Sequence, residues 1–180
     1  MEIIKTKIEG LLILKPKVFL DDRGYFFESF RLDKFRELGI DFEFLQDNES
    51  KSQKGVLRGL HFQDPPFDQG KLIKVVKGAV IDVAVDIRVK SPTYGKWVSH
   101  ELSEYNKTMF WIPPGFAHGF LTLEDETIFQ YKCTNYYNKG CEGSIRWNDP
   151  ELDIDWGIDK PLVSDKDKHA PLFIDLKSKF

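Results

Sequence analysis

The chain has 180 residues, of which 41% are hydrophobic, and a formal net charge of −3. This length fits one domain with a substantial core and is short for two, so we expect a single domain over residues 1–180. The balance of 26 Lys and Arg against 29 Asp and Glu argues against nucleic acid as a partner. No apolar run approaches the roughly 20 residues that cross a bilayer, and residues 1–10 carry charges, so we expect a cytoplasmic protein without membrane association.

The first predicted elements in chain order are a turn and a short helix. Asp21 to Gly24 has the polar, glycine-ended composition of a turn. Leu32 to Leu38 has helical character, with Phe35 and Leu38 on one side and Gly39 placed to cap its end. We expect this helix to be an accessory element.

Residues 73–88 predict two strands joined by a turn at Lys77–Gly78. In the second strand Ile81, Val83, Val85 and Ile87 alternate with smaller or charged residues, and a period of two is typical of a strand. Further turn signals fall at residues 91–95, 104–107, 113–115, 138–140 and 148–150. Short strands separated by frequent turns, in a chain with 14% aromatic residues, indicate an all-β sandwich or barrel.

The last predicted strand is Phe129 to Tyr137, which if regular would place Tyr131 and every second residue after it on one face. The chain after Asp149 is rich in Asp, Lys and Pro. We therefore expect an irregular segment from about residue 150 that packs on the barrel.

Two motifs look like the metal-binding turns of a cupin barrel with most ligands missing. Such a cage takes a His-x-His pair, a Glu and a third His, because a divalent ion needs several lone pairs that converge at about 2 Å. Here His61 and the Pro113–His118 turn are present, but Gln63 stands where the second His would be. Lys71 would add a positive charge that repels a cation. The pattern predicts no metal and favours a pocket for proton transfer.

His61 is the candidate general base, since a neutral imidazole accepts protons well near pH 7. A carboxylate that fixes its tautomer would improve it. The aspartates that could do so, among which spacing alone does not choose, are Asp64, Asp82, Asp86, Asp165 and Asp167. For each of them, a solvated or hydrogen-bonded structural role is the ordinary alternative.

Lys71 and Tyr131 are candidates for the other steps of a proton exchange. A lysine near the base would stabilise a developing oxyanion, although most lysines are simply exposed. A tyrosine opposite the base would return a proton to the other face of a carbon, although aromatic residues on strands are more often core. Arg23 to Glu28 is either a turn and strand or a guanidinium and ring that bind phosphate and base.

Together these segments resemble the dTDP-4-dehydrorhamnose 3,5-epimerases of deoxysugar nucleotide synthesis. The resemblance runs in order along nearly the whole chain. The segments that carry it are Asp22–Phe30, Gln46–Asn48, Gly55–Gln63, Gln69–Leu72, Asp82–Arg88, Gly115–Phe120, Tyr131–Tyr137 and Ser164–Asp167.

The resemblance implies a cupin-like jelly roll with a few short helices, a homodimer with strand exchange, and neither metal nor organic cofactor. By this resemblance His61 would accept the proton and Asp167 would orient the His61 imidazole. Tyr131 would donate a proton, and Lys71 would stabilise the enolate. The substrate would be dTDP-4-dehydro-6-deoxy-D-glucose, inverted at C3 and C5 to dTDP-4-dehydro-L-rhamnose. The residues it assigns to substrate binding are Arg23, Phe26, Glu28, Gln46, Asp47, Asn48, Arg58, His118, Tyr137, Glu142 and Lys166.

Three other functions compete with this one. Related enzymes of antibiotic pathways invert one carbon only and keep much of the same machinery. A metal-dependent cupin would use His61 and His118 as ligands, although two histidines alone hold a divalent ion poorly. A sugar-nucleotide binding barrel would have the same pocket without the reaction.

Overall fold

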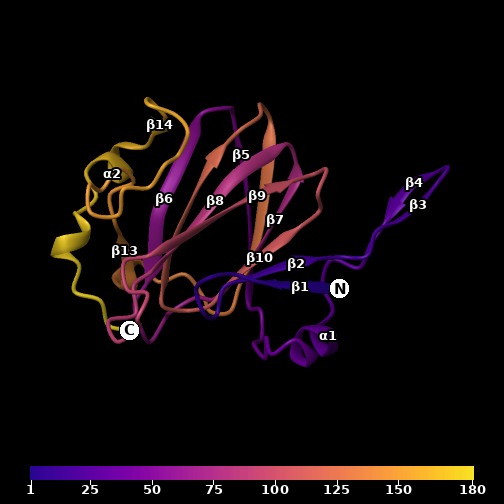
Figure 1. Ribbon diagram of the computed structural model, residues 1–180, viewed down its shortest axis with the longest axis horizontal. Helices are drawn as coiled ribbons and strands as arrows, with labels where there is room; N and C mark the ends of the chain where they lie inside the picture. The colour runs from indigo at the N-terminus through magenta and orange to yellow at the C-terminus, as the bar shows by residue number, and fades with distance from the viewer.

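Two packed sheets form most of the protein in the computed structural model, which describes residues 1–180 (Figure 1). The first sheet contains, in spatial order, β1 (Glu2–Lys5), β2 (Leu12–Lys15), β10 (Met109–Ile112), β7 (Lys71–Lys77), β12 (Thr127–Cys133) and β5 (Gln46–Ser52). The second contains β13 (Glu142–Ser144), β6 (Val56–Gln63), β11 (Phe116–Thr122), β8 (Ala79–Asp86) and β9 (Trp97–Ser103), and β14 (Leu162–Val163) pairs with β6. The protein is an all-β, cupin-like jelly roll, as the sequence predicts.

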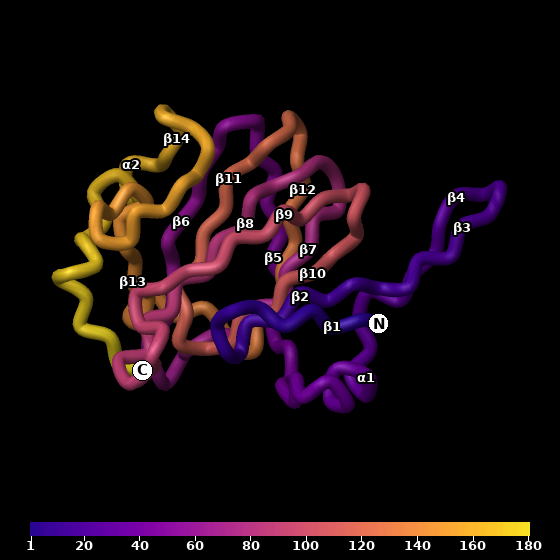
Figure 2. The backbone as a smooth tube through the Cα atoms, viewed as in Figure 1, coloured from indigo at the N-terminus to yellow at the C-terminus, as the bar shows by residue number.

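The remaining elements are short. They are a hairpin of β3 (Phe19–Asp21) and β4 (Gly24–Phe26), the helices α1 (Leu32–Glu37) and α2 (Asp165–Lys168), and the 3₁₀ turns η1 (Lys139–Cys141) and η2 (Phe173–Asp175). The predicted helix is confirmed as α1, and Gly39 follows it with a φ of 83°. Figure 2 shows the hairpin extending away from the barrel, while the C-terminal segment runs along the opposite side. None of the helices has the length and apolar character that a membrane crossing needs.

The predicted turn between β7 and β8 depends on Gly78. Its φ is 77°, a left-handed conformation, and a Cβ atom there would lie 3.1 Å from the Cα of Thr127. Only glycine meets both requirements. Beyond it, Val83, Val85 and Ile87 pack in one buried cluster with Ile81 against its edge, so the predicted apolar face of this strand is confirmed.

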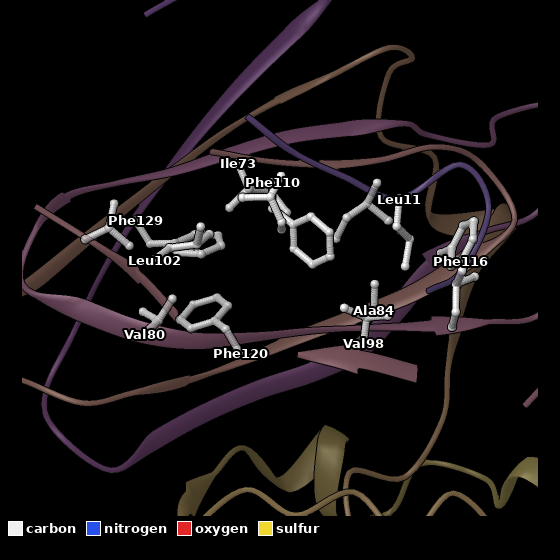
Figure 3. Packing of buried hydrophobic residues seen from close by; sticks show 14 residues of the cluster. Leu11, Ile73, Val80, Ala84, Val98, Leu102, Phe110, Phe116, Phe120 and Phe129 are labelled. Atoms are coloured by element: carbon white, nitrogen blue, oxygen red, sulfur yellow. The ribbon is translucent and has the colours of Figure 1, made fainter. Parts of the chain in front are cut away.

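The barrel interior is filled by apolar side chains from both sheets (Figure 3). Ile73 and Phe110 of the first sheet meet Val80 and Val98 of the second in a cluster of 14 buried residues. A large side chain buried in such a core contributes about 1.5–3 kcal/mol. This packing fixes the distance between the two sheets, and with it the width of any cavity between them.

A second cluster covers the outer face of the second sheet. Leu152, Trp156 and Phe173 of the C-terminal segment pack there against residues of β6 and β8. Buried Asp149 anchors the segment, because its carboxylate accepts the backbone N–H groups of Leu152 at 3.1 Å and Phe173 at 2.7 Å. The segment is irregular, yet it is held against the sheet.

The predicted strand Phe129 to Tyr137 is too long, because β12 ends at Cys133. Both neighbouring strands stop pairing there, with Cys133 opposite Gln46 on one side and Lys71 on the other. The side-chain oxygen of Asn135 then accepts the N–H of Tyr136, which favours a turn over continued pairing with a neighbouring strand. Tyr137 therefore does not share a strand face with Tyr131.

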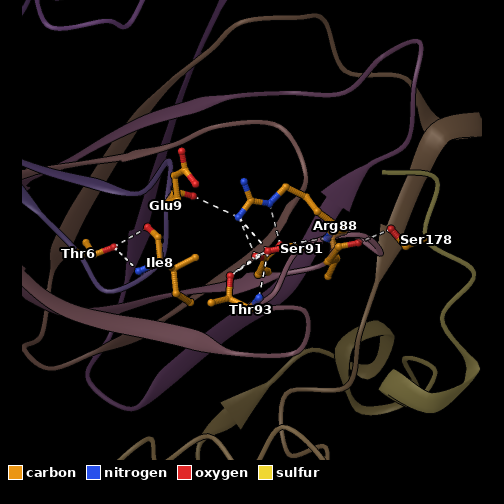
Figure 4. Close-up of polar contacts among 9 residues, drawn as sticks. Thr6, Ile8, Glu9, Arg88, Ser91, Thr93 and Ser178 are labelled. Atoms are coloured by element: carbon orange, nitrogen blue, oxygen red, sulfur yellow. Dashed lines mark hydrogen bonds and ion pairs between the residues drawn. The ribbon is translucent and has the colours of Figure 1, made fainter.

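A buried carboxylate ties one end of β8 to the N-terminal loop (Figure 4). Asp86 accepts hydrogen bonds from Arg88 Nη2 at 2.7 Å and from the hydroxyls of Ser91 and Thr93 at 2.6 Å each. Arg88 Nη2 also donates to the carbonyl of Glu9 at 3.1 Å. Burial alone would raise the pKa of Asp86, but these hydrogen bonds lower it below its ordinary value. The network is structural and leaves Asp86 unavailable to His61.

Candidate active site

A cavity of about 550 Å³ opens between the two sheets, beside α2. The four residues predicted to act chemically all line it, although they come from distant parts of the chain. They are His61 on β6, Lys71 on β7, Tyr131 on β12 and Asp167 on α2. The fold therefore brings the predicted chemical groups into one place.

His61 and Asp167 form a short hydrogen bond. The Nε2 of His61 lies 2.6 Å from Oδ1 of Asp167, whose side chain is only 5% exposed, whereas the imidazole is 33% exposed. Because a carboxylate accepts, Nε2 carries the hydrogen and Nδ1 is the nitrogen left to take a proton. Burial alone would raise the pKa of Asp167, but the bond to His61 helps to lower it, so this carboxyl stays ionised at neutral pH.

The structure selects Asp167 among the aspartates that spacing left open. β14 pairs in parallel with β6, which places the following residues beside the start of that strand. Ser164 then caps α2, with its hydroxyl accepting the N–H of Asp167 at 3.1 Å. The result is a contact between side chains 106 positions apart in sequence.

Two glycines shape the strand that carries His61. Gly59 has a φ of 132°, and a Cβ on it would lie 2.5 Å from the Cα of Gly119 on β11. The register between β6 and β11 shifts at this point, between His118 and Phe120. As a result Leu57 and Leu60 both pack in the outer cluster, and His61 points into the cavity.

Tyr131 and Lys71 approach from the other sheet. They lie on adjacent strands, with Lys71 Nζ 6.0 Å from the centre of the Tyr131 ring. Burial raises the pKa of Tyr131, which keeps its hydroxyl protonated at neutral pH. Burial lowers the pKa of Lys71, and the charges of Asp82 and Glu142 act in the opposite direction. His61 and Tyr131 therefore belong to facing walls of the cavity.

A second histidine and aspartate lie deeper in the barrel. His118 Nε2 contacts both carboxylate oxygens of Asp82, at 2.9 and 3.0 Å, and both side chains are almost completely buried. Burial raises the pKa of Asp82 and lowers that of His118, since each loses water around its charged form. The alternation in β8 placed Asp82 on a face opposite the large apolar residues, but its partner could not be read from the sequence.

Several predicted substrate-binding residues surround the mouth of the cavity. Arg58 lines it and donates to the Ser52 hydroxyl at 3.1 Å. Lys166 also lines it and pairs with Glu142 at 2.5 Å, and the hydroxyl of Tyr137 donates to the same carboxylate at 3.2 Å. We call Arg58, Lys166, Glu142 and Tyr137 the rim; the last three are joined by hydrogen bonds, and Arg58 bonds separately to β5.

The three predicted residues of β5 divide between its two faces. Gln46 accepts the N–H of Tyr137 at 2.8 Å, and Asn48 donates to the sulfur of Cys133 at 3.6 Å. Asp47 lies on the other face, where it pairs with Lys132 at 2.9 Å. Ser50, which the sequence did not single out, lines the cavity with a buried hydroxyl that has no protein partner.

Arg23, Phe26 and Glu28 lie outside this cavity. They belong to or follow the β3–β4 hairpin, which Figure 1 shows projecting from the barrel. Arg23 pairs with Asp21 at 2.5 Å on the surface, and Phe26 is 70% exposed. Within one chain the structure does not bring them to His61. No group of three or more His, Cys, Asp and Glu side chains is placed to hold a metal ion.

A jelly roll with a His–Asp pair in one wall and a tyrosine and a lysine in the other has the make-up of an acid–base isomerase. The family model described as dTDP-4-dehydrorhamnose 3,5-epimerase matches residues 5–175. The chain belongs to the dTDP-4-dehydrorhamnose 3,5-epimerase family and is an isomerase.

Individual relatives are similar in sequence to most of this chain. A dTDP-4-dehydrorhamnose 3,5-epimerase of Shigella flexneri is 54% identical over 176 residues, which cover 97% of each chain. The crystal structure of a dTDP-6-deoxy-D-glucose-3,5-epimerase from Legionella pneumophila, in complex with dTDP-4-keto-L-rhamnose, is 53% identical. It superimposes with a TM-score of 0.92, covering 95% of this chain and 92% of that one. A dTDP-4-dehydrorhamnose 3-epimerase of Streptomyces niveus is 38% identical over 94% of this chain and 83% of its own length.

Proposed function

We propose that this protein converts dTDP-4-dehydro-6-deoxy-D-glucose to dTDP-4-dehydro-L-rhamnose by inverting C3 and C5, in dTDP-L-rhamnose biosynthesis. The observation that carries the proposal is the placement of the hydrogen-bonded His61 and Asp167 in one wall of the cavity and Tyr131 in the facing wall. Inversion of a carbon needs a base on one side and an acid on the other. The names of the relatives supply the substrate.

The reaction follows from the acidity of carbons next to a ketone. His61 removes the proton from C3 or C5, and the electron pair of the C–H bond moves to the C4 oxygen to give an enolate. Lys71 stabilises that oxygen electrostatically. Tyr131 then gives its proton to the opposite face of the same carbon as the carbonyl re-forms. Asp167 holds His61 in the tautomer that accepts and stabilises the imidazolium that results.

The rim residues bind the nucleotide part of the substrate. Arg58 and Lys166 supply cationic groups for the diphosphate, which guanidinium and ammonium groups recognise well, and His118, which lies deeper, contacts the sugar. Tyr137, with Glu142 beside it, supplies an exposed ring at the mouth for the nucleoside. No residue in this scheme requires a metal or an organic cofactor.

Proton NMR of the reaction in deuterium oxide tests the proposal. The protein is incubated with dTDP-4-dehydro-6-deoxy-D-glucose, and the signals at C3 and C5 are followed. We expect both signals to disappear as deuterium enters and both carbons to invert. Exchange at one carbon alone would make the protein a single-carbon epimerase, and no exchange at either would leave only a binding function. Activity that is lost on chelation and regained with a metal would identify a metal-dependent cupin.

We further propose that the protein is a cytoplasmic chain of one domain. We also propose that it forms a homodimer in which the β3–β4 hairpin of each chain reaches the cavity of the partner. The hairpin exposes Phe19 (53%), Leu20 (80%) and Phe26 (70%), which is costly in water. It also carries Arg23 far from the cavity of its own chain. A second copy with strand exchange would cover the apolar groups and use the guanidinium.

Mixing two inactive variants tests the exchange. His61→Ala lacks the base and Arg23→Ala lacks the hairpin guanidinium, so each homodimer is impaired. If the hairpin serves the partner, half the dimers in an equal mixture are mixed, and each contains one intact site. We expect about one quarter of wild-type activity after mixing and refolding. Activity no higher than the mean of the two separate variants would contradict strand exchange, and a monomer in sedimentation would contradict the dimer.

A further inference from the structure

Gln63, which stands where a cupin would have its second metal histidine, uses its whole side-chain amide to hold two loops. It is 5% exposed. Its Nε2 donates to the carbonyl of Phe67 at 2.6 Å and to that of Tyr136 at 3.1 Å, and its Oε1 accepts the N–H of Asn138 at 2.7 Å. A primary amide is the side chain that offers two donors and an acceptor together, which histidine and glutamate do not. The residue is therefore matched to this contact.

The residue between the two held backbone groups is Tyr137. Its own N–H donates to Gln46 at 2.8 Å, so three consecutive residues are fixed by side chains of the barrel strands. Tyr137 as a whole nevertheless remains 53% exposed, and its hydroxyl donates to Glu142, the partner of Lys166 on the cavity wall. A rigid backbone under an exposed ring is the arrangement that a stacking surface needs, because little entropy is then lost on binding.

Gln63 also fixes where this ring lies relative to the catalytic base. It is two residues from His61 on β6, a strand paired on both sides, with Glu142 opposite Gln63 and Ser144 opposite His61 on β13. Hydrogen bonds from such a strand hold the loop in a fixed position relative to the strand. No other side chain of the strand reaches the Tyr136–Asn138 turn.

We propose that Gln63 is a positioning residue for substrate binding, which acts by holding the Tyr136–Asn138 turn so that the Tyr137 ring stays at the mouth as a platform for the nucleoside. This inference rests on the proposed function, because it assumes a nucleoside diphosphate ligand. Its effect falls on binding and not on proton transfer, since the Gln63 amide is bonded to loop backbone and not to His61, Tyr131 or Lys71.

Two variants of Gln63 and a matched control test the proposal. Gln63→Met keeps the volume and removes all three bonds, and Gln63→Glu keeps only the acceptor for the Asn138 N–H. The control, Gln53→Met, removes an exposed bond to Glu126 between two side chains that do not line the cavity. Calorimetric titration with dTDP should show about tenfold weaker binding for Gln63→Met, a smaller loss for Gln63→Glu and none for the control. KM should rise by the same factor while kcat stays within about twofold.

A double-mutant cycle shows whether the effect passes through Tyr137. If it does, Gln63→Met should add less than about twofold to the loss of dTDP affinity that Tyr137→Ala causes alone. Losses that multiply, or wild-type affinity in Gln63→Met, would overturn the proposal. A fall in both kcat and melting temperature, with KM unchanged, would make Gln63 merely structural.

Amide hydrogen exchange gives a result that does not depend on the substrate. In ligand-free Gln63→Met the N–H of Tyr137, which is bonded to Gln46 and not to Gln63, should exchange at least about tenfold faster than in wild type. Unchanged protection would refute the positioning role even if dTDP proved not to be the ligand. Failure of the wild-type protein to bind dTDP, with faster exchange in the variant, would refute the proposed function and the nucleoside platform with it, while Gln63 would still be shown to hold the turn.

Discussion

The His61→Ala variant is expected to lose at least about 10³-fold in deuterium exchange at both C3 and C5, because it removes a partly exposed imidazole in the cavity wall that an ionised carboxylate orients. Binding of dTDP should change little, since the rim residues are untouched. The imidazole is partly exposed and lies outside the apolar clusters, so the fold should survive. Proton NMR measures the exchange, and calorimetry measures the binding.

Two controls separate loss of the base from loss of the fold. His169→Ala removes an exposed imidazole that is bonded to the carbonyl of Asp165. This variant should catalyse deuterium exchange at C3 and C5 at nearly the wild-type rate. Thermal unfolding of His61→Ala should stay within a few degrees of wild type. Exchange that persists at both carbons in a folded His61→Ala protein would remove His61 from the role of base.

The Tyr131→Phe variant is expected to separate exchange from inversion. The ring keeps its packing against the interior cluster, and only the hydroxyl is lost. His61 can still remove a proton and return a deuteron to the same face, so labelling of the starting sugar should continue. Formation of the inverted product should fall by about 10²–10⁴-fold, the usual contribution of a general acid.

The measurement compares deuterium in recovered substrate with the amount of inverted product. Tyr105→Phe, which changes a tyrosine that is 73% exposed, is the matched control and should behave as wild type. Wild-type rates of inversion in Tyr131→Phe would show that the proton comes from another donor. Loss of labelling and inversion together would instead place Tyr131 in the first step.

Local patterns predicted most of the fold correctly. The alternation around Val83 and Val85, the glycine turn at Gly78 and the helix after Arg31 depend on neighbours within a few residues, and all three are present. The end of β12 was misplaced because pairing partners stop at Cys133, a property of β5 and β7 that the residues of β12 do not record. Local propensity therefore did not set this boundary.

The candidate site was predictable as a set of residue types, and its members could be recognised through a family resemblance. The geometry of the site was not predictable from the sequence. Spacing left five aspartates equivalent, whereas the structure satisfies Asp86 with Arg88 and pairs Asp82 with His118. The positioning contacts of Gln63 were also invisible, because its partners are backbone groups, which have no sequence signature.

The sequence by itself determined a β-rich barrel with one histidine, one lysine and one tyrosine suited to moving protons, since periodicity and side-chain chemistry are properties of short segments. Only the tertiary structure decided which carboxylate meets His61 and that Tyr131 approaches from the facing sheet. The reason is that β14 and α2 pack beside β6 from more than 100 positions away. Contacts of that range are selected by the burial and pairing of the whole chain, and no local segment contains them.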